Sequence, residues 1–356
     1  MTVGFGLVGC GGAAVDIARA IDQGTDTRGA ATFDRLASNA EDLATGRGAT
    51  VHPDLDALLA DPAVDVVYVG LPHDLLEPTA RRAIEAGRHV LVEKPMALTV
   101  EGIRGLADAA RERDLLAGVV FELRQVAAIG AARRLLQDGA IGNVRSIRIQ
   151  AVIDKPASYY ASGATGRVID DWRAHRDRAG GGVVLMNAIH QLDLLRWLTG
   201  REVIRVVADV AMAGEGVDVE DRAVAGLRLD DGTLVSLTAT AHSPGAADQE
   251  RIELDGTDGR LDLPDPYTDR PTQLYLRRIW EGLAPDRWHP IDPPAVDPYV
   301  PLIAGVADAV TTGGATPLPA SAADAAAALA IVLAIYESAA SRRAVDLPVA
   351  SATVGP

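Results

Sequence analysis

The chain begins with short apolar runs that alternate with longer segments of helical periodicity. The apolar runs, each of four to six residues, predict strands: Val3–Val8, Ala30–Phe33, Val64–Val69, His89–Val92 and Leu116–Phe121. The segments between or before these strands predict helices, which end near Gln23, Thr45, Ala60, Ala86 and Arg113. Uninterrupted apolar strands are typical of a sheet covered on both faces. Regular alternation of strands and helices predicts a parallel, doubly wound α/β sheet.

After Phe121 the pattern changes to strands in which apolar and polar residues alternate, which is typical of a sheet with one exposed face. These predicted strands are Ile147–Ile153, Val203–Val210, Ala223–Leu229, Leu234–Ala241, Ile252–Leu254 and Arg260–Leu263. Asp231-Gly232 predicts a hairpin turn between two of them. Helices are predicted at Val126–Gln137, Val183–Leu198, Leu302–Thr312 and Ala320–Arg343, and Pro264–Pro301 is predicted to be a wrapping loop. We therefore predict an α/β domain over residues 1–121 and, over residues 122–356, an α+β domain with a large, mostly antiparallel open sheet.

A glycine-rich loop follows the first predicted strand and opens the first helix. Gly9, Gly11 and Ala14 have the spacing of the dinucleotide-binding fingerprint, and Gly12 and Ala13 lie at the helix start, where free N–H groups attract phosphates. A tight turn without a ligand is the alternative. The second predicted strand ends in an acid, Asp34, 20 residues after Ala14. This order of elements favours a Rossmann dinucleotide-binding domain.

Asp34 and Arg35 bear on which dinucleotide would bind. A carboxylate at this position accepts a hydrogen bond from the adenosine ribose of NAD and repels the 2′-phosphate of NADP. Arg35 would partly offset that repulsion by reaching the phosphate or stacking on adenine. We therefore predict NAD, with NADP as an alternative. Asp34 is otherwise explained as the start of the turn into the next helix.

Two further predicted strands end in residues that suit a ligand site, since open parallel sheets bind ligands beyond the carboxyl ends of their strands. His89–Val92 runs directly into Glu93-Lys94-Pro95, which predicts that Lys94 lies over the ligand and that Glu93 positions the loop. The alternative is an ordinary solvated strand end. Leu71-Pro72-His73 follows another strand and is predicted to contact the cofactor, although a histidine there is also a common turn or helix-cap residue.

Charge and cysteine content narrow the class of protein. The net charge of −15 disfavours a nucleic-acid partner, because binding to phosphates requires clustered Lys and Arg. The single cysteine, Cys10, excludes an internal disulfide and a cysteine-based zinc site, and no metal is predicted. The longest apolar run, Ala325–Tyr336, has about half the length of a membrane span, and we recognise no export signal. We therefore expect a cytoplasmic protein without a membrane partner.

The predicted helix Val183–Leu198 carries a candidate pair for proton transfer. Met186, His190 and Asp193 follow one another at spacings of four and three residues, so all three would share one helix face. A histidine with a carboxylate one turn away is suited to proton transfer. The alternative is that His190 is an ordinary core histidine and that Asp193 is its hydrogen-bonding partner or a charge on the helix face.

Several motifs occur together, in the order in which one known family has them. The Gly9 loop, Gly70-Leu71-Pro72-His73, Glu93-Lys94-Pro95, Gly180-Gly181-Gly182 and Ala188–Asp193 resemble the Gfo/Idh/MocA oxidoreductase family, over nearly the whole chain. The resemblance implies NAD- or NADP-dependent oxidation or reduction of sugars, cyclitols and related polyols, with Lys94 and His190 as catalytic residues. It also implies a homo-oligomer, a dimer or a tetramer, formed through the exposed face of the second sheet.

The chain departs from the family pattern at two positions. Met186 stands where the resemblance implies an aspartate, and methionine can neither take nor give a proton. Leu76 stands where many members have a histidine. These departures motivate one alternative, a cofactor-bound sensor or scaffold without turnover. A further alternative is an enzyme that retains NAD for transient oxidation, as in glycoside cleavage.

Lys94 and His190 still support a hypothesis for the reaction. Oxidation of a secondary alcohol releases a hydride to the nicotinamide and a proton from oxygen. Lys94, desolvated beside the positively charged nicotinamide, would take or return that proton, and His190 would hold the same oxygen with its tautomer fixed by Asp193. The residues predicted to contact the remaining hydroxyls are Glu122, Tyr160, Arg173 and Asn187. A cis Lys94–Pro95 peptide bond is also predicted.

Overall fold

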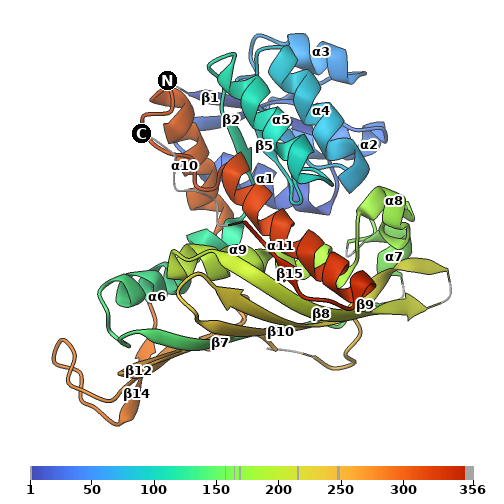
Figure 1. The fold of residues 1–356 in the computed structure, drawn as a ribbon. Helices are drawn as coiled ribbons and strands as arrows, with labels where there is room; N and C mark the ends of the chain where they lie inside the picture. The colour runs from blue at the N-terminus through green and yellow to red at the C-terminus, as the bar shows by residue number, and fades with distance from the viewer. Residues whose placement is uncertain are drawn as a thin grey trace. The chain divides into compact units, whose positions relative to one another are not determined.

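The computed structural model describes residues 2–348, apart from residues 157, 164, 168–169, 215 and 247–248. Its first sheet has six parallel strands in the order β3-β2-β1-β4-β5-β6 (Figure 1). Their bounds are β1 (Val3–Val8), β2 (Thr27–Phe33), β3 (Thr50–Val51), β4 (Val66–Val69), β5 (His89–Val92) and β6 (Ala117–Val119). The order reverses between β1 and β4, which is where open α/β sheets form a ligand crevice.

A helix from late in the chain completes the core of this first sheet. Helix α10 (Tyr299–Thr311) packs against α1 (Gly12–Gln23), and Ile303 and Val306 share one buried cluster with Ile17, Ile21 and Phe5. The remaining helices that connect the strands are α2 (Ala37–Ala44), α3 (Leu55–Ala60), α4 (His73–Glu85) and α5 (Val100–Arg111).

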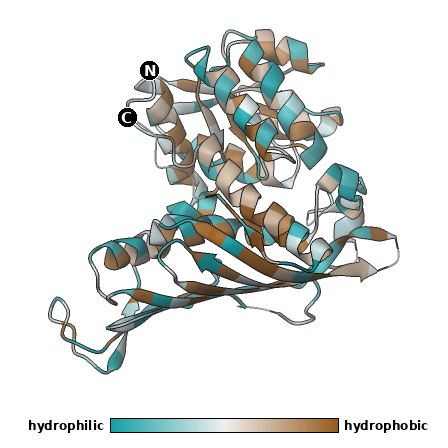
Figure 2. Ribbon diagram, viewed as in Figure 1, coloured by the Kyte–Doolittle hydropathy of each residue, from teal (hydrophilic) through white to brown (hydrophobic). Residues whose placement is uncertain are grey.

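The second sheet has nine strands in the order β14-β13-β12-β11-β7-β10-β9-β8-β15. Their bounds are β7 (Val144–Val152), β8 (Val203–Gly214), β9 (Val217–Leu229), β10 (Leu234–Thr240), β11 (Glu250–Gly256), β12 (Gly259–Pro264), β13 (Thr272–Leu276), β14 (Arg287–Ile291) and β15 (Val345–Asp346). Only β7 and β10 are parallel, and the other neighbours are antiparallel. Buried and exposed residues alternate along much of β9 and along β10, and the strands of this sheet carry both hydrophobic and hydrophilic residues (Figure 2). The predicted fold class is confirmed, as is the hairpin at Asp231-Gly232 between β9 and β10.

The prediction that Pro264–Pro301 is a wrapping loop is wrong, because β13 and β14 lie within it. Leu274 and Leu276 point into the core of the second sheet, while Gln273 and Tyr275 are less buried, so β13 has the alternation of a half-exposed strand. The proline content concealed these strands. Pro290 has no N–H to donate. It is accommodated because β14 is the last strand of the sheet and has a neighbouring strand on one side only.

The chain folds as two compact units, each built from three segments. The first comprises the chain up to Gln125, Ala157–Gly181 and Val296–Leu329, and the second comprises Val126–Pro156, Gly182–Ala295 and the chain from Ala330 on. The sequence analysis divided the chain once, after residue 121, whereas the structure assigns two later segments to the first unit. The predicted roles of the two domains stay predictions.

Helix α11 (Ala322–Ser341) is 20 residues long, so it exceeds the apolar run that the sequence analysis considered. Within the described part of the chain, it is the one helix long and apolar enough to cross a membrane, by length and composition alone. Of its most apolar stretch, 56% is buried inside the protein. This burial is typical of the core helix of a globular protein.

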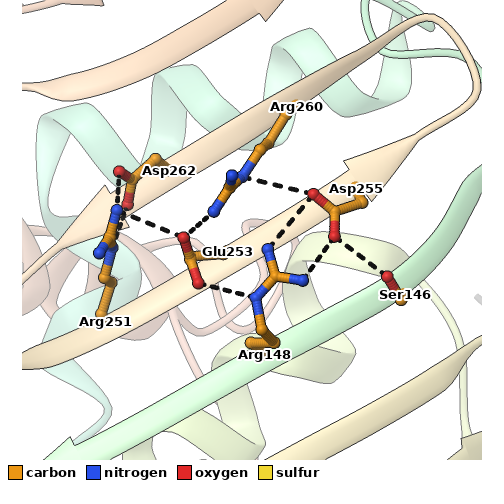
Figure 3. A network of polar contacts seen from close by, with 7 residues as sticks. All are labelled: Ser146, Arg148, Arg251, Glu253, Asp255, Arg260 and Asp262. Carbon is orange, nitrogen blue, oxygen red and sulfur yellow. Dashed lines mark hydrogen bonds and ion pairs between the residues drawn. The ribbon is translucent and has the colours of Figure 1, made fainter.

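One face of the second sheet is exposed, and its half on β8, β9 and β10 carries apolar side chains among charged ones such as Arg205, Asp209 and Arg228. Val207, Val224 and Leu234, on β8, β9 and β10, lie on this face and are 54%, 63% and 52% exposed. On β7, β11 and β12 the same face carries a charged network, in which Arg148 binds Glu253 at 2.8 Å and Asp255 at 2.7 Å (Figure 3). Its other members are Ser146, Arg251, Arg260 and Asp262.

Candidate active site

The glycine loop after β1 is shaped by close backbone approaches. Gly9 has φ +84°, and a Cβ atom there would lie 2.3 Å from the carbonyl oxygen of Gly70, so only glycine fits. Helix α1 begins at Gly12 with no side-chain cap and no acid in its first turn, and Ala13 is exposed. The N–H groups of this turn are therefore not capped by side chains, and they suit a phosphate.

Both oxygens of Asp34 accept backbone hydrogen bonds. Oδ2 accepts from the N–H of Cys10 at 2.6 Å, and Oδ1 accepts from the N–H of Leu36 at 2.8 Å. The second bond is the turn role that the sequence analysis gave as the alternative. The first bond joins the end of β2 to the glycine loop, which puts the carboxylate beside the predicted phosphate site. Binding of the ribose by Asp34 stays a prediction.

Part of the Ala157–Gly181 segment lies against this cofactor region. The Nε of Arg167 donates to the carbonyl oxygen of Cys10 at 3.4 Å, and its Nη1 forms an ion pair with Asp42 at 2.8 Å. Thr165 lies beside Gly12, where an added Cβ would come within 2.7 Å of the threonine methyl group. The sequence analysis missed these residues, because they lie more than 100 positions from the glycine loop and no local motif marks them.

Glu93 is held within the loop that carries Lys94. Tyr68 donates its hydroxyl to Oε1 of Glu93 at 3.1 Å, and the N–H of Lys94 donates to Oε2 at 3.3 Å. Burial raises the pKa of the Glu93 carboxyl, and the Lys94 charge and the Tyr68 bond offset this only in part. The Lys94–Pro95 peptide bond is cis, as predicted. Glu93 is therefore a structural part of the loop and not a solvated strand end.

His73 connects the loop after β4 to the Ala157–Gly181 segment. Its Nδ1 donates to the carbonyl oxygen of Ala179 at 2.7 Å, and its ring lies 4.5 Å from that of Trp172. Burial, together with the charges of Lys94 and Arg173, lowers the pKa of His73 to about 3, although the hydrogen bond to Ala179 opposes this shift. His73 is thus a neutral donor, within electrostatic range of both cations.

The low pKa of His73 predicts a loss of stability in mild acid. Because the folded value of about 3 lies below the ordinary 6.5, unfolded chains bind more protons, and stability falls as the pH drops from about 6.5 towards 3. His73→Asn keeps a donor and removes this titration. The fall in melting temperature from pH 7.5 to pH 5 should therefore be smaller in His73→Asn than in the wild type. His242→Asn, at an exposed histidine, should not change it; equal slopes in all three proteins would contradict the prediction.

In the second unit, a buried carboxylate fixes the segment that leads to His190. Glu220 is 2% exposed and accepts from the N–H groups of Gly182 at 2.7 Å and Val184 at 3.0 Å, and from the Tyr336 hydroxyl at 2.8 Å. A Cβ atom on Gly182 would lie 1.7 Å from the Glu220 carbonyl oxygen. The sequence analysis missed Glu220, because an acid within a strand pattern gives no sign of binding a distant helix terminus.

The predicted regular helix after the glycines begins instead with a π-helical turn, η3 (Val184–Ala188), followed by α9 (Ile189–Thr199). The turn contains Met186 and Asn187, and wide turns of this kind are frequent at functional sites. Met186 and Asp193 are buried, whereas Asn187 and His190 are half-buried among fully buried neighbours. The shared face predicted from α-helical spacing therefore applies to His190 and Asp193 only.

The predicted site residues divide between the two units. The first unit holds Gly9, Gly11, Gly12, Ala13, Ala14, Asp34, Arg35, Leu71, Pro72, His73, Glu93, Lys94, Glu122, Tyr160 and Arg173, and the second holds Asn187 and His190. Arg173 stacks over the Trp172 ring at 4.4 Å, Glu122 is buried in a short 3-10 helix, and Tyr160 lies beside Tyr159. Leu76 is fully buried, so it fills core space. The pairing of Lys94 with His190 stays a prediction.

Comparison with known proteins identifies the family. Residues 3–121 match the model of the oxidoreductase family with an NAD-binding Rossmann fold, and residues 129–262 match the GFO/IDH/MocA C-terminal domain. The chain is 31% identical over 261 residues to 1,5-anhydro-D-fructose reductase of Ensifer adhaerens, covering 73% of each chain. It is 27% identical to inositol 2-dehydrogenase of Rhizobium meliloti (strain 1021), covering 73% of this chain and 75% of the relative.

A solved structure agrees over almost the full length. The structure of GenD2 from gentamicin A biosynthesis, in complex with NAD, has a TM-score of 0.83 and 28% identity, and the match covers 98% of this chain and 97% of that chain. The two family models together span most of the chain, in the order that the sequence motifs predicted. The protein therefore belongs to the Gfo/Idh/MocA family of oxidoreductases and has that family's NAD-binding Rossmann fold.

Proposed function

We propose that this oxidoreductase transfers a hydride between NAD and a secondary alcohol or ketone of a sugar derivative or cyclitol. The observation that carries the proposal is the loop after β5, where Glu93 accepts from the Lys94 N–H and Lys94 follows the carboxyl end of a strand of the same parallel sheet as the glycine loop. Relatives named for 1,5-anhydro-D-fructose and inositol support the substrate class.

The residues beyond β1 and β2 fit a dinucleotide. The first turn of α1, at Gly12 and Ala13, has N–H groups without a side-chain cap, which suit the pyrophosphate. Asp34 suits the adenosine ribose, and Leu71 and Pro72, half-buried after β4, suit the nicotinamide half. When bound, NAD supplies the acceptor or donor of the hydride.

Lys94 and His190 handle the proton in this proposal. Lys94 takes the proton from the reacting hydroxyl as the carbon–hydrogen bond breaks, or returns it to the carbonyl oxygen in the reverse direction. His190 donates a hydrogen bond to the same oxygen, and Asp193, one turn further along α9, fixes its tautomer. The apolar Met186 takes no part in proton transfer.

The other hydroxyls of the substrate are assigned to four polar residues. Arg173 is preorganised by its stacking on Trp172, and Asn187 remains partly exposed in the π-helical turn. Glu122 and Tyr160 complete the set. Planar guanidinium, amide and carboxylate groups bind pairs of hydroxyls well, which agrees with a polyol substrate.

Two measurements on the purified protein test the proposal. Quenching of tryptophan fluorescence measures NADH binding, and absorbance of NADH measures turnover with a panel of anhydrosugars, ketoses, inositols and their oxidised forms. Turnover of at least one polyol is the expected result. Tight binding of NADH without turnover across the panel would contradict the proposal and would favour a sensor or scaffold.

We also propose that the protein is a homo-oligomer. The exposed half-face formed by Val207, Val224 and Leu234 on three adjacent strands supports this, since burying apolar area favours association. The neighbouring charged network would lie at the rim of such an interface, where polar residues are common.

Val224→Glu is expected to shift the protein from oligomer to monomer. The substitution puts a carboxylate on β9, between the strands of Val207 and Leu234 and directly opposite Asp209, where a second carboxylate buried in an interface is unfavourable. Light scattering coupled to size-exclusion chromatography gives the mass. Val296→Glu changes a valine of similar exposure, 55%, outside the sheet, and should keep the wild-type mass. An unaltered mass for Val224→Glu would show that this face is not the interface.

A cytoplasmic location is proposed on composition. The single cysteine, Cys10, lies buried within the glycine loop, and a chain with one cysteine forms no internal disulfide, which agrees with a reducing compartment. The acidic net charge agrees with a small-molecule substrate and not with a nucleic acid.

A further inference from the structure

Arg35, at the end of β2, is held by an acid from the Ala157–Gly181 segment. Its Nη2 lies 3.1 Å from Oδ2 of Asp170. In Rossmann domains that bind NADP, an arginine next to the β2 terminus accommodates the 2′-phosphate. Arg35 occupies that sequence position, directly after Asp34, yet its guanidinium is paired with a carboxylate of its own chain.

Asp170 is a well-fixed anion. Its side chain is 11% exposed, and Oδ1 accepts from Arg178 at 2.7 Å and from the N–H of Trp172 at 2.9 Å, which leaves Oδ2 for Arg35. Burial alone would raise the pKa of Asp170, but the hydrogen bonds from Arg178 and the Trp172 N–H, together with the charges of Arg178 and Arg35, outweigh it and lower that pKa. Asp170 is therefore charged at neutral pH, and it does not depend on Arg35 for its position.

This arrangement discriminates between the two dinucleotides by charge. The ribose of NAD carries a neutral 2′-hydroxyl, which requires only an acceptor such as Asp34. The 2′-phosphate of NADP adds about two negative charges near Asp34, so it needs a cation to offset the repulsion. To supply this cation, Arg35 would have to break its ion pair with Asp170. The Asp170 carboxylate would then repel the 2′-phosphate as well.

We propose that Asp170 is a positioning residue for cofactor selectivity, which favours NAD over NADP by holding Arg35 away from the 2′-phosphate. The inference rests on the proposed site of the adenosine ribose at Asp34. In this proposal two acids favour NAD. Asp34, at the end of β2, acts directly, and Asp170, which is distant in the sequence, acts through Arg35.

Asp170→Asn should strengthen NADPH binding about two- to fivefold, the effect expected from releasing one partly exposed ion pair, with NADH binding changed less than twofold. Fluorescence titration of the full-length protein with NADPH and NADH gives both dissociation constants. Asp170→Asn/Arg35→Ala should lose the gain. A gain that persists in the double variant would mean that Asp170 acts by charge alone, which would overturn the role of Arg35.

Two further variants keep the test decisive. Asp171→Asn, at the neighbouring and largely exposed acid that pairs with His175 and Arg178, should leave the selectivity unchanged. Arg35→Ala alone should weaken NADPH binding less than twofold, because Arg35 is already engaged; a tenfold loss would overturn the proposal even if Asp170→Asn fails to fold. Asp34→Ala checks the site itself: if it does not change the ratio of NADH to NADPH affinity, the ribose site is misassigned, and the failure is not specific to Asp170.

Discussion

Lys94→Met is expected to lower kcat by about 10²- to 10⁴-fold, the range that general acid–base catalysis contributes. Methionine has nearly the length of lysine and preserves packing in the loop, but it cannot exchange a proton. Because the contacts of Glu93 with Tyr68 and with the backbone of residue 94 do not need the ammonium group, the loop should keep its shape. NADH affinity should therefore change little. Steady-state rates and fluorescence titration separate the two quantities.

The chain provides a matched control for this substitution. It has only two lysines, and the other, Lys155, also precedes a proline. Lys155→Met makes the same chemical change in the second unit and should keep wild-type kcat. If Lys94→Met and Lys155→Met have similar activity, Lys94 does not transfer the proton. If a His190→Asn variant retains full activity, His190 has no role in proton transfer, and the proposed role of Lys94 is unaffected.

Gly182→Ala is expected to destabilise the protein by about 3 kcal/mol, which corresponds to a fall of roughly 5 to 10 °C in melting temperature. The added Cβ would lie 1.7 Å from the Glu220 carbonyl oxygen, so backbone must move. That movement would also displace the N–H groups of Gly182 and Val184 from the Glu220 carboxylate. Differential scanning calorimetry of the full chain measures the shift.

Gly130→Ala is the matched control, and its expected effect on the melting temperature has the opposite sign. Gly130 lies inside helix α6 (Ala127–Gln137) of the same unit, and an added Cβ would meet only the end of the Arg134 side chain, at 3.8 Å. Alanine is favoured over glycine inside a helix by about 0.5 to 1 kcal/mol, so the melting temperature should rise slightly. If Gly182→Ala has the same melting temperature as the wild type, the close approach to Glu220 is readily relieved.

The structural features that depend on local sequence pattern could be predicted from the sequence. Apolar runs predicted the buried strands of the first sheet, and the glycine loop and Lys94 follow β1 and β5 as expected, while their roles in a site stay predictions. The short edge strand β3 was missed, because two exposed residues carry no periodic signal. Strands β13 and β14 were missed, because Pro264–Pro301 is rich in proline, and proline excludes only the interior of a sheet and not its edge.

Contacts between segments distant in the sequence could not be predicted. Nothing near Arg35 indicates that Asp170 pairs with it, and nothing near Gly182 indicates that Glu220 caps the turn that follows. The π-helical turn at Val184–Ala188 also escaped the analysis, because one residue of extra length per turn leaves the apolar pattern almost unchanged. Such pairings depend on the tertiary fold, whereas the chemistry of each residue could be recognised in advance.

The late position of α10 determines when the nucleotide-binding unit can finish folding during synthesis. Ile303 and Val306 cover Ile17 and Ile21, yet they are translated after nearly all of the second unit. While the ribosome is still adding the second sheet, the apolar face of α1 has no cover from α10, and exposed apolar surface of this kind promotes aggregation of nascent chains. A chain released after residue 125 would keep that face uncovered, so we expect a truncated Rossmann unit to require chaperones or to precipitate.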